Sequence, residues 1–252
     1  MDFPQLETVK VSQEDNVGVI SLNRPDRLNA MNSQLVYDVR LAFDWINSSD
    51  DIQVIIFRGE GRAFCAGDDR KDHQHPDSID EAAGFVKAIQ AVTSAIIFGP
   101  KLVVGEINGW AVGGGFEWAI NCDFSFWSKT ARAFFPEVSL NLFVTGAVTS
   151  LLPAMVGLNK AREMLLLGDQ YDADTLRQMG LAYKIVDENE LKEQVFAFAK
   201  RLAALPPKSS QAMKKALNKS AMMNLSEALD LETELTVSGF MDPETTRYLK
   251  EF

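Results

Sequence analysis

The sequence of 252 residues lacks the features that mark several large classes of protein. It contains two cysteines and two histidines, and Cys65 and Cys122 do not form a set with metal-ligand spacing. Its 35 acidic and 25 basic residues give a net charge of -10, which argues against a nucleic-acid surface built on clustered Lys and Arg. No apolar stretch approaches the length of a membrane span, and the N-terminal residues lack the basic and apolar regions of a signal peptide. We therefore expect a cytoplasmic protein with buried free thiols and no metal, nucleic-acid or membrane partner.

Two nucleotide-binding signatures are also missing. The glycines do not follow the Gly-x-Gly-x-x-Gly spacing of dinucleotide-binding folds, and no Gly-Lys-Ser/Thr follows a glycine-rich loop. The composition is otherwise ordinary for a globular protein, with 46% hydrophobic and 24% charged residues. A chain of this length and composition is able to bury one large core.

The hydrophobic pattern of the first half predicts alternating strands and helices. Strand-like apolar runs cover residues 17–22, 53–58 and 102–107, and helical patterns cover residues 32–46 and 79–97. This alternation indicates an α/β core with helices packed over a sheet.

The second half has a nearly all-helical pattern, apart from a short strand-like run at residues 183–186. Two consecutive prolines mark a boundary near residue 205, where a new helix can open, and we expect helices at residues 208–220 and 225–237. The predicted organisation is a core of residues 1–204 and a helical appendage of residues 205–252.

Two glycine-containing segments each follow an apolar strand-like run. They read FCAGDD at residues 64–69 and NGWAVGGGFE at residues 108–117, and a helix-forming stretch follows the second. Glycine lets a ligand atom approach main-chain N–H groups closely, and the N–H groups at the first turn of a helix lack intrahelical partners. Such turns suit an oxyanion, although a tight packing turn or a phosphate-binding nest would have a similar glycine cluster.

Two glutamates lie just beyond these turns. Glu117 directly follows the glycine triplet, and Glu137 ends the segment FPE at residues 135–137. Both have bulky apolar neighbours, so desolvation is expected to raise their pKa toward the range used for proton transfer. Each glutamate alone is typical of a solvated or ion-paired residue, but together with the glycine turns they indicate acid–base chemistry beside a carbonyl group.

The motifs resemble those of the crotonase superfamily, the enoyl-CoA hydratase/isomerase family, over most of the chain. They are NRPDRLNAM at residues 23–31, AFCAG at 63–67, ING at 107–109, GGGFE at 113–117, CD at 122–123, FPE at 135–137 and LPAMVG at 152–157. The resemblance implies an α/β fold with a core of repeated ββα units, a helical C-terminal region, and acyl-CoA thioester substrates. It also implies a homotrimer or a hexamer made of two trimers, and no cofactor beyond the coenzyme A of the substrate.

The resemblance also implies roles for individual residues. The backbone N–H groups of Asp68 and Gly114 would form an oxyanion hole, beside Glu117 and Glu137 as the acid–base pair. The coenzyme A moiety would contact Arg24, Arg27, Leu28, Ala30, Ala66 and Asp68. We expect the acyl pocket to be narrowed by Trp110, Phe116, Leu142 and Phe143.

Retention of both glutamates favours a hydratase, which adds water to a 2-enoyl-CoA and gives a 3-hydroxyacyl-CoA. In that reaction Glu117 would activate the water and Glu137 would supply the proton to C2. Relatives that only shift a double bond usually keep the second acid and place an apolar residue at the first position. An isomerase, a decarboxylase, a dehalogenase, a thioesterase and a non-catalytic acyl-CoA-binding subunit remain alternatives, because one fold hosts many chemistries.

Several polar residues depart from the family pattern or fall outside it. Asp68 stands where a small residue is usual, and we expect its side chain and that of Asp69 to point away from the oxyanion. Glu106 replaces a small apolar residue and is either a third active carboxylate or a paired structural charge. His73 and His75 are expected to be solvated loop residues near the substrate entrance rather than metal ligands.

Overall fold

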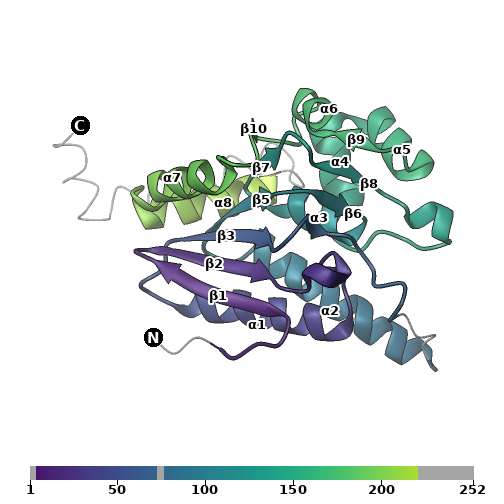
Figure 1. Ribbon diagram of the computed structural model, residues 1–252, viewed down its shortest axis with the longest axis horizontal. Helices are drawn as coiled ribbons and strands as arrows, with labels where there is room; N and C mark the ends of the chain where they lie inside the picture. Colours follow the sequence, from purple (N-terminus) through teal and green to yellow (C-terminus); the bar gives the residue numbers. More distant parts are fainter. Residues whose placement is uncertain (1–3, 73–76, 221–252) are drawn as a thin grey trace.

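The computed structural model describes residues 4–72 and 77–220. Its main sheet has six strands in the order β1-β2-β3-β5-β7-β10 (Figure 1). The N-terminal strand β1 (Val9–Glu14) pairs antiparallel with β2 (Val17–Leu22). The other four strands run parallel to β2 and are β3 (Val54–Gly59), β5 (Leu102–Ile107), β7 (Phe124–Ser128) and β10 (Lys184–Val186).

A second, smaller sheet has the order β4-β6-β8-β9. Its first three strands each follow a main-sheet strand: β4 (Ala63–Cys65) follows β3, β6 (Trp110–Val112) follows β5, and β8 (Arg132–Phe134) follows β7. The short β9 (Tyr171–Asp172) pairs antiparallel with β8. The helices that follow successive strand pairs are α1 (Ser33–Ser48), α2 (Ile79–Ile97) and α3 (Gly114–Asn121). This succession is the repeated ββα arrangement that the family resemblance implies.

Helices cover both faces of the main sheet (Figure 1). On one face α1 packs against β1 and β2, and α2 packs against α1 and α3. On the other face α7 (Leu191–Ala203) packs against β2, β3, β5 and β7. Side chains alternate between these faces along each strand, so Ile55 and Phe57 of β3 belong to the α1 side and Ile56 belongs to the α7 side.

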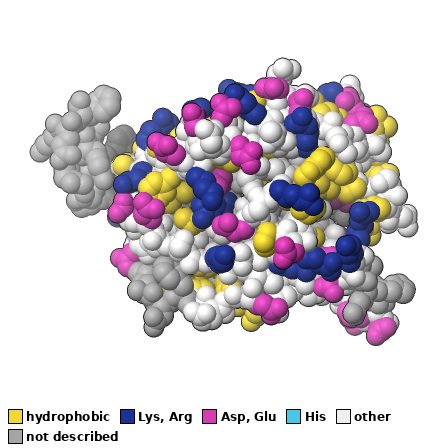
Figure 2. All heavy atoms as spheres, in the orientation of Figure 1, with side chains coloured by type: hydrophobic (Ala, Val, Ile, Leu, Met, Phe, Trp, Pro, Cys, Tyr) yellow, Lys and Arg dark blue, Asp and Glu magenta, His cyan; other side chains and the backbone are white. Residues whose placement is uncertain are grey.

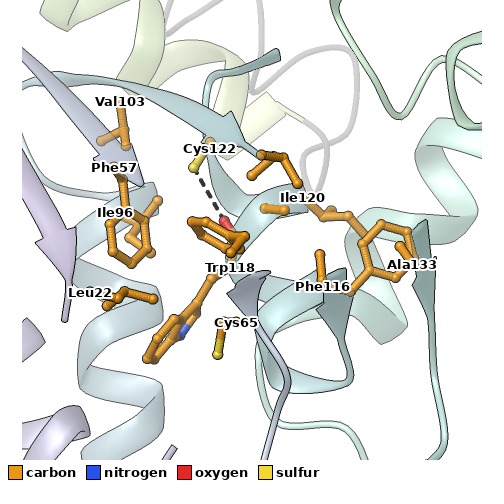
Figure 3. Close-up of a cluster of buried hydrophobic side chains, with 14 of the residues drawn as sticks. Leu22, Phe57, Cys65, Ile96, Val103, Phe116, Trp118, Ile120, Cys122 and Ala133 are labelled. Atoms are coloured by element: carbon orange, nitrogen blue, oxygen red, sulfur yellow. Dashed lines mark hydrogen bonds between the residues drawn. The ribbon is translucent and has the colours of Figure 1, made fainter. Parts of the chain in front are cut away.

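Aromatic side chains fill the larger of the two cores. The ring of Phe57 meets Phe64 edge-on at a centroid distance of 5.2 Å and lies 5.8 Å from the ring of Trp118. Figure 3 shows Trp118 of α3 between Cys65 and Cys122, and the Cys122 thiol donates to the Trp118 carbonyl at 3.2 Å. Both cysteines are free and buried, as predicted, and burial raises the pKa of Cys65 to about 12. The helix that carries Glu117 is therefore fixed by the core on which it rests.

The second half of the chain is mostly helical, as predicted. Its helices are η2 (Glu137–Leu140), α4 (Val148–Val156), α5 (Leu158–Leu167), α6 (Ala173–Gln178), α7 and α8 (Pro207–Ser220). The helix predicted at residues 208–220 is α8, whereas the helix predicted at 225–237 lies outside the described residues. Division of the chain at residue 205 stays a prediction. Among the helices of the described ranges, none is long and apolar enough to cross a lipid bilayer.

One buried lysine joins α8 to the core. The Lys214 ammonium donates to the carbonyls of Ile96 and Lys101, at 2.7 and 2.8 Å, and to the Asp123 carboxylate at 2.7 Å. Asp123 also accepts from the N–H of Val103 at 2.7 Å. All three donor positions of the ammonium are used, so the charge is compensated although Lys214 is 5% exposed.

Candidate active site

The two glycine turns predicted to approach one ligand lie side by side. Strands β4 and β6 are parallel neighbours, with Cys65 opposite Ala111, so the segments that follow them emerge together. A Cβ atom at Gly67 would lie 2.7 Å from the Val112 carbonyl oxygen, which is closer than real Cβ atoms come. Gly67 also has a φ of +77°, where L side chains are strained. Glycine at this position therefore permits the close approach of the two turns.

The orientation of the Asp68 N–H follows from the hydrogen bonds of its neighbours. Met31 donates its N–H to the Gly67 carbonyl at 2.7 Å and accepts from the Asp69 N–H at 2.9 Å. The Gly67 carbonyl and the Asp68 N–H belong to one trans peptide and point in opposite directions. The Asp68 N–H is thus directed away from Met31, toward the side on which β6 lies.

The second turn places Gly114 at the start of α3. Gly113 adopts φ +52° and ψ -124°, and its N–H donates to the Phe134 carbonyl of β8 at 3.0 Å. Gly114 is the first residue of α3, where an N–H has no intrahelical acceptor and carries the positive end of the helix dipole. Together the two turns offer main-chain donors to a negatively charged oxygen.

Glu117 lies one turn into α3 and is almost wholly buried, with 1% of its surface exposed. The N–H of Thr145 donates to its two carboxylate oxygens at 3.1 and 3.2 Å. Burial raises the pKa of Glu117 to about 7; the nearby charge of Glu137 adds to the increase, and the Thr145 N–H opposes it. The environment therefore produces a carboxyl group that is partly ionised at neutral pH, as predicted from its apolar neighbours.

Glu137 opens η2 and reaches the same turn from the other side. Its Oε1 atom lies 2.5 Å from the position that a Cβ atom of Gly113 would occupy. Its Oε2 atom is buried and has no hydrogen-bond partner among residues 4–72 and 77–220. Burial raises the pKa of Glu137 as well. Glu117 and Glu137 are thus brought together beside the glycine turns, and their pKa shifts suit proton transfer at a carbon next to a carbonyl.

The segment before α1 is bonded to the first glycine turn. It contains η1 (Pro25–Arg27), after which the carbonyl of Leu28 accepts from the Ala66 N–H at 3.0 Å. The Arg24 guanidinium pairs with the Asp69 carboxylate at 2.9 Å and also donates to the Ala30 carbonyl. Burial raises the pKa of Asp69, but the hydrogen bond and charge of Arg24 outweigh it and hold the pKa below its usual range. The Asp69 carboxylate is therefore turned toward Arg24, and its orientation relative to a bound oxyanion stays a prediction.

These contacts distinguish between the two arginines expected at the coenzyme A phosphates. The Arg24 side chain is 14% exposed, and its guanidinium is engaged with Asp69 and Ala30. The Arg27 side chain is 37% exposed and lies 3.6 Å from the Asp69 carboxylate. Arg27 is therefore the better placed of the two for a phosphate group. Figure 2 shows basic side chains in the area of this face where η1 lies in Figure 1.

The four residues expected to narrow the acyl pocket occupy different environments. Phe116 has no exposed surface and stacks on Phe135 at a centroid distance of 4.7 Å, so its ring belongs to the core rather than to an open pocket wall. Trp110 is 36% exposed, Leu142 46% and Phe143 76%. These three side chains remain available to an acyl chain.

Glu106 and the two histidines stand out in the sequence as polar residues with an open role. Glu106 lies on the α7 side of β5, away from Glu117, since Val104 of the same strand face belongs to the core under α7. It is therefore not a third carboxylate of this site. His73 and His75 lie outside the described residues.

The main chain at Thr145 and Gly146 contributes to the site, although the sequence gives little sign of it. The Thr145 N–H donates to the Glu117 carboxylate, and a Cβ atom at the adjacent Gly146 would overlap that carboxylate. A backbone N–H can come from any residue except proline, so only the glycine gives a sequence signal.

Comparisons with known proteins agree with this architecture. A family model described as enoyl-CoA hydratase/isomerase matches residues 12–251. A protein of Rhizobium meliloti named probable enoyl-CoA hydratase is 32% identical over 235 residues, which cover 93% of this chain and 90% of the relative. The short-chain-enoyl-CoA hydratase of Clostridium acetobutylicum is 29% identical over 231 residues, or 91% of this chain and 88% of the relative.

Solved structures show the same fold. The structure of an enoyl-CoA hydratase subunit I from Geobacillus kaustophilus has a TM-score of 0.91 and 29% identity, over 98% of this chain and 97% of that one. An enoyl-CoA hydratase from Bacillus anthracis has a TM-score of 0.91 and 25% identity, over 97% and 95% of the two chains. The chain belongs to the enoyl-CoA hydratase/isomerase family of the crotonase superfamily.

Proposed function

We propose that this protein is an enoyl-CoA hydratase that adds water reversibly to a 2-enoyl-CoA and forms a 3-hydroxyacyl-CoA. The observation that carries the proposal is the pair of neighbouring carboxylates beside the glycine turns, buried Glu117 and half-buried Glu137, each with a raised pKa. A reaction that only moves a proton needs one such group, whereas addition of water needs a base for the water and an acid for the carbon. Relatives named enoyl-CoA hydratase support the same reaction.

The thioester carbonyl would bind between the N–H groups of Asp68 and Gly114. Negative charge moves onto this oxygen as the nucleophile adds to C3, and fixed main-chain donors stabilise that charge without reorganisation. Loss of one such donor costs about 3 to 4 kcal/mol in other enzymes. The positive end of the α3 dipole contributes a smaller amount, about 0.3 to 2 kcal/mol.

The two glutamates would divide the proton transfers. Ionised Glu117 accepts a proton from water while the water oxygen bonds to C3, and the π electrons move toward the carbonyl. Protonated Glu137 then delivers its proton to C2. The sum is one water molecule added across the C2–C3 double bond, after which a proton passes from Glu117 to Glu137 by exchange with solvent and restores the enzyme. The reverse sequence removes the water. A pKa of about 7 lets Glu117 serve as base in one direction and as acid in the other.

The same proposal includes substrate recognition and assembly. Arg27 and the main chain at Leu28, Ala30 and Ala66 would contact the coenzyme A moiety, which is the only coenzyme the reaction needs.

We also propose self-association into trimers or hexamers, which is supported by exposed apolar side chains on α4 and α5. Those side chains are Met155, Leu158, Leu166 and Leu167. Light scattering on the purified protein would measure the mass of the assembly.

Product analysis tests the proposed reaction. The wild-type protein is incubated with crotonyl-CoA while the enoyl-thioester absorbance is followed, and the products are separated by chromatography and weighed by mass spectrometry. We expect the absorbance to fall and a product heavier by one water molecule to appear. Formation of 2-enoyl-CoA from a 3-enoyl-CoA, with no hydration of crotonyl-CoA, would instead identify an isomerase.

A further inference from the structure

A cavity of about 480 Å³ lies between the main sheet and α7. Its floor is formed by β-strand side chains that include Val19 and Ile56, and Phe196 of α7 forms a wall. Figure 2 shows hydrophobic, basic and acidic side chains meeting between α7 and the β1–β3 edge of the sheet. Because Glu106 faces α7 whereas Glu117 belongs to α3, this cavity is separate from the candidate active site.

The inner end of this cavity carries the carboxylate of Glu106. Glu106 is 2% exposed, and no residue of the described chain donates a hydrogen bond to it or pairs with it within ion-pair distance. Burial raises the pKa of Glu106, and Arg58 and Lys192 act in the opposite direction from farther away. A desolvated carboxylate without a donor is unfavourable, and a cation that enters the cavity would relieve that cost.

The basic groups of the cavity do not compensate Glu106 directly. Arg58 is its neighbour on β3, but the Arg58 guanidinium donates to the Ser21 hydroxyl at 2.9 Å and pairs with Glu60 at 3.6 Å. Lys192 is exposed in the first turn of α7. Two further carboxylates line the cavity, those of Glu14 and Glu193. The lining therefore has an excess of negative charge, with the most buried charge at its inner end.

We propose that this cavity binds a small organic cation, with a primary ammonium group on Glu106 and an apolar body against Phe196. The volume lies within the range of small-molecule pockets, and the lining combines three apolar side chains with one deeply buried carboxylate among more exposed polar and charged residues. An anionic ligand is disfavoured, because the Glu106 carboxylate at the inner end would repel it. The described part of the chain contains no group of three His, Cys, Asp or Glu side chains placed for a metal ion, so an organic cation fits better than a metal.

Three probes that share one apolar body test the proposal on the wild-type protein. Isothermal titration calorimetry compares benzylammonium, benzyl alcohol and benzoate. We expect benzylammonium to bind at least tenfold more tightly than the other two. Equal affinity for the alcohol, tighter binding of benzoate, or no binding of benzylammonium would overturn the proposal, and these comparisons do not depend on the folding of a variant.

Two variants then locate the interaction. Glu106→Gln should weaken benzylammonium binding at least tenfold and keep crotonyl-CoA turnover, because Glu106 lies outside the acid–base pair. Lys192→Gln removes a competing cation and should leave the affinity unchanged or increase it. Unchanged benzylammonium affinity in a folded Glu106→Gln variant would contradict the assignment. This inference does not rest on the proposed function. Hydration of crotonyl-CoA by a wild-type protein that does not bind benzylammonium would therefore refute the ammonium site and leave the proposed hydratase function intact.

Discussion

The guanidinium of Arg24 lies 2.9 Å from the carboxylate of Asp69, and this pair joins the segment before α1 to the turn that carries Asp68. Met31, in the same segment, bonds the turn on both sides of Asp68. The position of the Asp68 N–H therefore depends on a contact between residues 45 positions apart in the sequence. In the proposed mechanism this ion pair would therefore act by holding the main chain at Asp68 rather than by contact with substrate.

Removal of the Asp69 charge should reduce stability and turnover together. Asp69→Asn leaves the half-buried Arg24 without its counterion, which we expect to cost on the order of 3 kcal/mol in the free energy of unfolding. Urea unfolding measures this loss. The control is Asp44→Asn, which removes the exposed Arg40–Asp44 pair and should cost about 0.3 to 0.5 kcal/mol.

The Asp69 contribution also has a defined pH dependence. Its pKa is lowered in the folded protein, so the pair stabilises the fold above the unfolded pKa, and that stabilisation is lost as pH falls through the folded pKa. The difference in stability between wild type and Asp69→Asn should therefore shrink in acid. A difference that grows as pH falls would contradict the role given to this pair.

A methyl group at Gly113 should inactivate the enzyme. Gly113→Ala places a Cβ atom 2.5 Å from Oε1 of Glu137, in a backbone conformation with φ +52° that alanine rarely adopts. We expect displacement of the Glu137 carboxylate and at least a hundredfold loss of kcat. Gly84→Ala is the matched control, because a Cβ atom there meets nothing within 4 Å and alanine should stabilise α2 by about 0.5 to 1 kcal/mol.

Neutralisation of Glu117 should stabilise the fold at high pH. The folded pKa is about 7 and the reference value is 4.5, so the folded state holds the proton more tightly, and Glu117 makes the fold less stable as pH rises between these values. Glu117→Gln should therefore gain about 1 to 3 kcal/mol over wild type above pH 7 and lose this advantage below pH 4.5. Chemical unfolding at a series of pH values tests the sign. If Glu117→Gln were less stable than wild type at pH 8, ionisation of the buried Glu117 carboxyl group would not destabilise the fold, and the argument would be wrong.

Loss of the Lys214 ammonium should release α8 from the core. Lys214→Met removes three hydrogen bonds at 2.7 to 2.8 Å and leaves the partly buried Asp123 carboxylate without its counterion. We expect a loss of about 3 to 5 kcal/mol in the free energy of unfolding. Lys200→Met removes an exposed pair with Asp15 and should change stability by less than about 1 kcal/mol. Similar losses in the two variants would show that α8 does not depend on Lys214.

Elements with a strong hydrophobic signal are predictable from the sequence. The pattern predicts β2, β5 and α2 to the residue, because each is an apolar or amphipathic run between turn residues. The three-residue strands β4, β6 and β8 are too short to show a period, and they become evident only as the second strand of each ββα unit.

The site is predictable only where side-chain identity carries the chemistry. The glycine turns, Glu117 and Glu137 are found from their motifs, and the structure brings them together. Phe116 is next to Glu117 in the sequence, yet successive helical residues point about 100° apart, so its ring enters the core. The Arg24–Asp69 pair joins distant segments, and nothing local in the sequence distinguishes it from a phosphate-binding arginine.

The most direct test of the two-carboxylate mechanism is the hydration of crotonyl-CoA by wild type, Glu117→Gln and Glu137→Gln, with the exposed Glu188→Gln as the control. Each active-site variant should lose about 10²- to 10⁴-fold in kcat, the usual contribution of a positioned acid or base, and the control should match wild type. Hydration within tenfold of wild type by either Glu117→Gln or Glu137→Gln would contradict the mechanism.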